Sequence, residues 1–86
     1  GSFKRDYKRE AKGPHRKTLD AVLVPVLRAL VTDQALAPRY RDHDLTGDWN
    51  GHRECHLKPD LLLIYRKVDD DSLILVRLGS HSELFG

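Results

Sequence analysis

The sequence predicts a small α+β domain in which two helices are followed by a three-stranded antiparallel β-meander. Apolar residues recur at helical spacing in the first third of the chain. Three strand-like runs follow in the second half, joined by connections of only a few residues, which is typical of antiparallel neighbours. Because 86 residues bury only a modest core, residues 1–86 are expected to form a single domain.

The first helix is predicted from a thin apolar stripe. Phe3, Tyr7 and Ala11 recur at i, i+4 and i+8, Ser2 is the expected N-cap, and the Gly-Pro pair at 13–14 ends the pattern. The other face of this helix carries basic side chains.

The second helix is predicted from a stripe that covers about three turns. Its apolar positions are Leu19, Val22, Leu23, Val26, Leu27 and Leu30. Pro25 removes one helical hydrogen bond and is expected to bend the axis. At about 100° per residue its ring lies about 130° from the centre of the stripe, so it should face solvent.

Three strands are predicted after a loop rich in Gly, Asp and Asn at residues 41–54. The first strand, residues 52–58, is short and mostly polar. The second and third, residues 61–68 and 72–78, begin with apolar side chains on both faces, as expected of strands that are covered on both sides. A Lys-Pro-Asp turn separates the first two strands, and residues 69–72 link the second to the third.

The net charge of +2 conceals an asymmetry along the chain. Residues 1–17 carry seven bases against two acids, a net charge of +5, and the other 69 residues carry a net charge of −3. A basic lobe favours phosphate-rich partners, although a solvated helix face would have the same composition. The seven bases are Lys4, Arg5, Lys8, Arg9, Lys12, Arg16 and Lys17.

Cysteine content and hydropathy indicate the compartment. A single cysteine, Cys55, excludes an intramolecular disulfide and suggests a reducing environment, so a cytoplasmic location is expected. No apolar run approaches the roughly 20 residues that span a bilayer, and the charged start lacks a signal-like segment. Neither secretion nor a membrane partner is therefore expected.

Histidines near the predicted strand ends point to acid–base chemistry. His56 and Asp60 flank the turn between the first two strands, and His81 follows the last strand, from where it can reach the same end of the sheet. Imidazoles and a carboxylate that titrate near neutral pH can exchange protons with a substrate. With a cation such as Arg77 to stabilise the phosphorane, they suit phosphodiester cleavage.

Several of these residues have a second interpretation. Trp49 either stacks on a base or packs over the small core. Arg77 alternatively pairs with Asp60 or Glu54, and Cys55 is interpreted as a packing residue rather than a nucleophile. A metal site is chemically allowed, but no HxxxH, HExxH or CxxC spacing supports it, and no cofactor is expected. Its ligands would be His43, His56, His81 and Asp60.

Three segments of the second half resemble one toxin family. They are "DHDLTGDWNGHRECH", "KPDLLLIY" and "GSHSELFG", at residues 42–56, 58–65 and 79–86. The chain is similar here to the YafQ branch of the RelE/ParE superfamily, the toxins of type II toxin–antitoxin operons. The resemblance extends more weakly through both predicted helices and implies a RelE-like fold.

The resemblance implies a ribosome-dependent endonuclease that cuts mRNA in the ribosomal A site without a metal. The mRNA 2′-hydroxyl would attack the adjacent phosphate and leave a 2′,3′-cyclic phosphate. The implied partners are a cognate antitoxin, the 70S ribosome with its RNA, and mRNA. The basic first helix is then expected to contact ribosomal RNA or the antitoxin, and Trp49 joins the expected RNA-binding residues.

Carried over residue by residue, the implied active site has six members. They are His43, His56, Asp60, Arg77, His81 and Phe85. In this interpretation His56, paired with Asp60, is the candidate base and His81 the favoured acid, and the two roles can be exchanged. Arg77 would bind the scissile phosphate with help from His43, and Phe85 would stack on the A-site nucleotides.

Two other functions on the same fold stay open. One is a ParE-like gyrase inhibitor, against which the retained histidines argue, and the other is an inactive module that only binds the antitoxin or represses its operon. The resemblance also implies a β-strand before the first helix, whereas this chain begins at that helix. We therefore expect the sheet either to lack an edge strand or to be completed by another segment.

Overall fold

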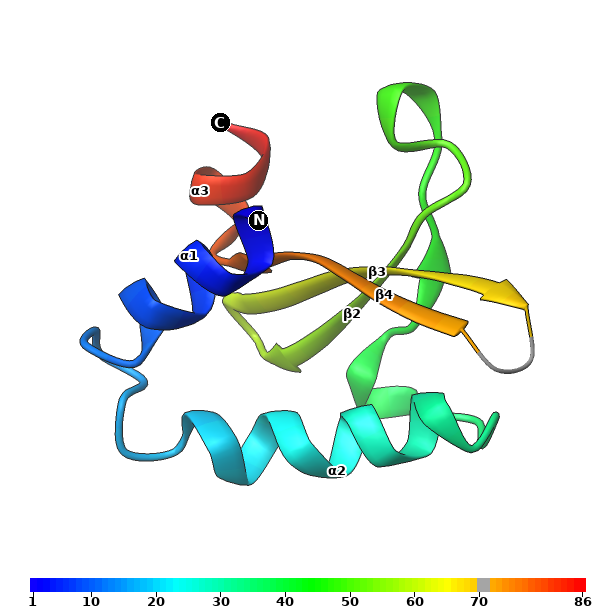
Figure 1. Cartoon of the computed structure of the whole chain (residues 1–86). Coiled ribbons are helices and arrows are strands. Elements are labelled where there is room, and N and C mark those ends of the chain that lie inside the picture. The colour runs from blue at the N-terminus through cyan, green and yellow to red at the C-terminus, as the bar shows by residue number, and fades with distance from the viewer. Residues whose placement is uncertain (70–71) are drawn as a thin grey trace.

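A computed structural model, which describes residues 1–69 and 72–86, has the predicted order of two helices followed by an antiparallel sheet (Figure 1). The first helix, α1 (Ser2–Glu10), has Gly1 as its N-cap, so the prediction of Ser2 at that position was wrong by one residue. The second helix, α2 (Leu19–Val31), contains Pro25, whose side chain is exposed as predicted. No helix in the described part of the chain is long and apolar enough to cross a membrane.

The described sheet has four strands rather than the three predicted, in the order β1-β2-β3-β4 with antiparallel neighbours. The strands are β1 (His43–Asp44), β2 (Arg53–Lys58), β3 (Leu61–Asp69) and β4 (Ser72–Gly79). The additional strand, β1, lies inside the segment predicted as a loop, because two residues are too few to show a periodic pattern. Of the predicted connection at residues 69–72, Asp70 and Asp71 lie outside the described residues.

Apolar side chains cover both faces of β3, as predicted for a central strand. On one face, α2 packs against side chains such as Cys55, Leu61 and Leu63, each 0% exposed. On the other face, Leu62 and Ile64 form a second cluster. These alternating positions explain why residues 61–65 are all buried.

A short third helix, α3 (His81–Phe85), ends the chain and was not predicted. Its start is a capping box, in which the Ser80 side chain accepts from the backbone N–H of Glu83, and the Glu83 side chain accepts from the backbone N–H of Ser80. Leu84 anchors the helix in the second apolar cluster. Figure 1 shows α3 beside α1, with both chain ends near one end of the sheet.

Candidate active site

The register of the sheet brings candidate residues from three strands onto one face. His43 on β1 pairs with Glu54 on β2, Glu54 pairs with Ile64 on β3, and Ile64 pairs with Arg77 on β4. Residues directly opposite each other point to the same side of a sheet, so these four share the face that carries α3. His56 lies two residues after Glu54 on β2 and therefore shares that face as well.

Glu54 lies between two of the predicted site histidines. Its Oε2 is 3.7 Å from Nε2 of His43, and its Oε1 is 3.4 Å from Nε2 of His56. The two imidazole rings are 6.4 Å apart between centroids. Because Glu54 is only 5% exposed, its charge needs partners that present a proton, and the two rings can supply them.

The geometry of His43 assigns one of its protons. Its Nδ1 lies 2.5 Å from the carbonyl oxygen of Arg41, and a carbonyl can only accept a hydrogen bond. Nδ1 therefore carries a proton, and Nε2, which faces Glu54, is the atom at which His43 can take up or release another. This arrangement is suited to proton transfer.

Glu54 was not among the site residues predicted from the sequence, and His56 was predicted to pair with Asp60 instead. The ion pair that the structure gives His56 is with Glu54. Asp60 instead accepts a hydrogen bond of 3.3 Å from the backbone N–H of His81, the first residue of α3. The available signal was the i, i+2 spacing of Glu54 and His56 on a predicted strand, which places both side chains on one face.

Aromatic rings connect α3 to the loop that precedes β2. The ring centroids of His81 and Phe85 are 5.0 Å apart. The ring centroids of Phe85 and Trp49 are 5.9 Å apart, in a T-shaped arrangement. Trp49 and Phe85 both pack against the second apolar cluster, which supports the packing interpretation of Trp49. Trp49 also lines a hollow of about 670 Å³ together with Lys4 and Arg77.

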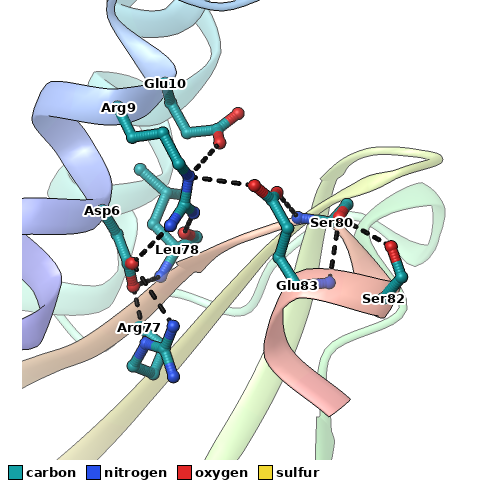
Figure 2. Close-up of polar contacts among 8 residues, drawn as sticks. All are labelled: Asp6, Arg9, Glu10, Arg77, Leu78, Ser80, Ser82 and Glu83. Carbon is teal, nitrogen blue, oxygen red and sulfur yellow. Dashed lines mark hydrogen bonds and ion pairs between the residues drawn. The ribbon is translucent and has the colours of Figure 1, made fainter. Parts of the chain in front are cut away.

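Arg77 is directed toward α1, where it pairs with a buried carboxylate rather than with Asp60 or Glu54 (Figure 2). Its Nε donates to Asp6 over 2.7 Å, and a second donor of the guanidinium reaches the other carboxylate oxygen over 3.3 Å. Burial by itself would raise the pKa of Asp6, but the hydrogen bonds from Arg77 and from the backbone N–H of Leu78 outweigh it and lower that pKa.

Arg9 belongs to the same network, although its side chain is 39% exposed (Figure 2). Its guanidinium bonds the side chains of Asp6 at 2.9 Å and Glu10 at 3.1 Å, and it donates to the carbonyl of Leu78 at 2.8 Å. The same group lies 3.0 Å from Glu83 on α3. Asp6 and Arg9 thus supply partners for both backbone groups of Leu78 on the edge strand β4, in place of a neighbouring strand.

Close packing around Arg9 explains the glycine that ends β4. A Cβ at Gly79 would lie 2.6 Å from a nitrogen of Arg9 and 3.2 Å from an oxygen of Glu83. The Ser80 N–H, which donates to Glu83, is the largest cause that holds the pKa of Glu83 below its usual value, and Arg9 contributes. Glu83 therefore both caps α3 and attaches it to α1.

The other sequence candidates lie apart from this network. The remaining bases of residues 1–17 are exposed: Lys4, Arg5, Lys8, Lys12, Arg16 and Lys17. Burial raises the pKa of the Cys55 thiol to about 12, in agreement with a packing role. Within the described ranges, no three His, Cys, Asp or Glu side chains come together in a way that could hold a metal ion.

Comparison with known protein families shows which family this chain belongs to. Residues 1–86 match the family model of the bacterial toxin YafQ of type II toxin–antitoxin systems. The chain belongs to the YafQ family. A curated YafQ relative, the mRNA interferase toxin YafQ of Escherichia coli K12, is 35% identical over 82 residues, which cover 93% of this chain and 88% of the relative.

Solved structures of bacterial toxins have the same fold. A copper-bound mutant toxin from Helicobacter pylori is 44% identical with a TM-score of 0.83, and the match covers 98% of this chain and 91% of that one. YafQ in the E. coli DinJ–YafQ complex is 36% identical with a TM-score of 0.84, covering 100% of this chain and 92% of that one. The α+β fold expected from the sequence is therefore confirmed, and it matches that of YafQ.

Proposed function

We propose that this YafQ-family toxin is an endoribonuclease that cuts mRNA in the ribosomal A site and so arrests translation. The supporting observation is the buried Glu54 between His43 and His56, on the sheet face that also carries α3 with His81. Imidazoles and carboxylates are side chains that serve as general acids and bases, which RNA cleavage requires. The E. coli relative is itself named an mRNA interferase.

In the proposed reaction, a base removes the proton of the 2′-hydroxyl, and the 2′-oxygen attacks the adjacent phosphorus. The bond from phosphorus to the 5′-oxygen breaks, and an acid protonates that oxygen. The products are a 2′,3′-cyclic phosphate and a 5′-hydroxyl. We assign His56, oriented by Glu54, as the base and His81 as the acid. The same two imidazoles could also serve with these roles exchanged.

Three further side chains are suited to hold the RNA. Arg77 gives two of its five N–H groups to Asp6, and its side chain is still 28% exposed, so the donors that do not bond Asp6 can bind the scissile phosphate. Phe85 lies beside His81 and Trp49 lies beside Phe85, and unstacked bases can lie on the partly exposed surfaces of these rings.

The same proposal covers the partners and the location. The exposed bases of α1 and the segment after it would contact phosphates of ribosomal RNA, whereas Arg9 would mainly connect α1 to β4 and α3. A cognate antitoxin would bind this chain, as DinJ is seen in complex with YafQ. With these partners, the proposal implies that the protein works in the cytoplasm.

Primer extension on translating ribosomes tests the activity. Purified, folded protein is expected to cut mRNA at positions aligned with codons. His56→Ala and His81→Ala should each reduce the cleavage rate by about 10²–10⁴-fold, because each removes a proton-transfer group. His15→Ala, which removes a histidine outside the site, serves as the matched control. Absence of cuts with folded protein would refute the proposal, and inhibited supercoiling instead would favour a gyrase inhibitor.

A further inference from the structure

A second hollow opens beside His56. It is a cavity of about 560 Å³ between α2, the 3₁₀ turn η1 (Pro38–Tyr40) and the end of β2. Its apolar floor includes Val22 and Leu57, and its polar wall includes Arg41 and Lys58. This volume is within the range of sites that hold small ligands. Because His56 also faces Glu54, the cavity adjoins the candidate active site.

The charges around this cavity have one sign. Arg39, Arg41 and Lys58 all line it, and no carboxylate does so in the part of the chain that the structure describes. Lys58 donates one of its ammonium protons to the side chain of Thr18, which leaves two protons for another acceptor. Cations gathered in one hollow repel each other, and an anion between them would relieve that repulsion.

The aromatic ring of Tyr40 lies next to these cations. The guanidinium of Arg39 lies over the ring of Tyr40, 4.9 Å from its centroid, and it also donates to the Tyr40 hydroxyl over 3.0 Å. Tyr40 is partly buried against the core, and the guanidinium plane that lies on its ring is a surface on which nucleobases stack. Phosphate-binding and base-stacking groups therefore line the same cavity.

We propose that this cavity binds a nucleotide of the RNA substrate that lies next to the phosphodiester bond that is cut. Arg39, Arg41 and Lys58 hold its phosphate, and Tyr40 packs against its base or ribose. An acidic peptide could satisfy the cations, but the stacking surface at Arg39 and Tyr40 and the shared wall at His56 favour a nucleotide. The inference rests on the proposed function, because RNA cleavage beside His56 is what supplies the nucleotide.

The test is a titration of the chain with nucleoside 5′-monophosphates, followed by NMR of backbone amides. Shift changes are expected at residues 39–41 and 56–58. Arg39→Gln and Lys58→Gln should each weaken binding about tenfold, because each loses a charge-assisted hydrogen bond. Arg66→Gln removes an exposed charge outside the cavity and should change the affinity little. Lys58→Arg, which keeps the charge, should retain most of the binding and shows that the site is folded.

Three results would overturn the inference: equal weakening by Arg66→Gln, shift changes confined to other residues, or a response to an acidic peptide but not to nucleotides. Binding is measured without ribosomes, so it is separate from cleavage. If wild-type protein cuts mRNA but no nucleotide enters the cavity, the inference alone is wrong. If nucleotides bind but no mRNA is cut, the proposed function is wrong and the binding site stands.

Discussion

The guanidinium of Arg9 in α1 lies 3.0 Å from the carboxylate of Glu83 in α3. This ion pair connects the first helix of the chain to the last, and the last helix carries His81 and Phe85. Since Glu83 also caps α3, the orientation of the C-terminal site residues depends on a basic residue near the N-terminus. A residue that sequence analysis assigned to RNA binding is thus a structural partner of the candidate site.

Arg9→Gln is expected to destabilise the fold by about 2–4 kcal/mol, because the buried carboxylates of Asp6 and Glu10 lose a cationic partner. For a domain of this size, such a loss lowers the melting temperature by roughly 10 °C or more. Thermal unfolding followed by circular dichroism measures this change. Lys8→Gln removes an exposed charge from the same helix and should leave the melting temperature nearly unchanged; similar losses for both variants would contradict the role given to Arg9.

Asp6 is expected to make the fold sensitive to acid. Its pKa is lowered in the folded state, so its contribution is fully present above the usual value of 3.8 and is lost as the pH falls through the lower, folded value. Urea unfolding at a series of pH values should show stability declining below about pH 4. In Asp6→Asn this component should disappear, and stability at neutral pH should drop by about 2–4 kcal/mol, since Arg77 loses its buried partner. An unchanged acid slope in the variant would show that other carboxylates are responsible.

Glu54→Gln is expected to lower the cleavage rate with little change in ribosome binding, because the side chain orients His43 and His56 and does not itself reach the RNA. Single-turnover cleavage measures the rate, and a ribosome-binding assay measures the affinity.

A structural loss at Glu54 would look different from the loss of a contact that orients the histidines. Reduced folding stability would lower the melting temperature of the variant, which thermal unfolding measures. Glu54→Asp keeps the charge and should recover part of the rate. If the rate does not change in Glu54→Gln, the carboxylate has no part in catalysis.

Cys55 is expected to resist thiol reagents while the chain is folded. Its side chain is 0% exposed, and burial raises the pKa of its thiol to about 12, so the reactive thiolate is scarce at neutral pH. Reaction with a chromogenic disulfide should be slow in buffer and fast in denaturant. Rapid modification of the native protein would mean that β2 opens easily.

The secondary structure followed from local patterns where those patterns were long. The i, i+3, i+4 spacing of α2 and the apolar start of β3 each contain enough residues to identify the element. The two-residue β1 and the five-residue α3 are too short to show such patterns. β1 forms by pairing with the backbone of β2, and α3 is held by Leu84, which packs against the apolar face of the sheet. The Ser80-x-x-Glu83 spacing was the one local signal for α3.

By itself, the sequence determined the order of the main elements, the burial of β3 and, through its motifs, the YafQ family. Only the tertiary structure decided the partners of the charged side chains: Glu54 for His56, Asp6 for Arg77, and Glu83 for Arg9. Periodicity reports which face of an element a residue occupies. Which charge it meets there depends on strand register and helix packing, which bring together residues that lie far apart along the chain.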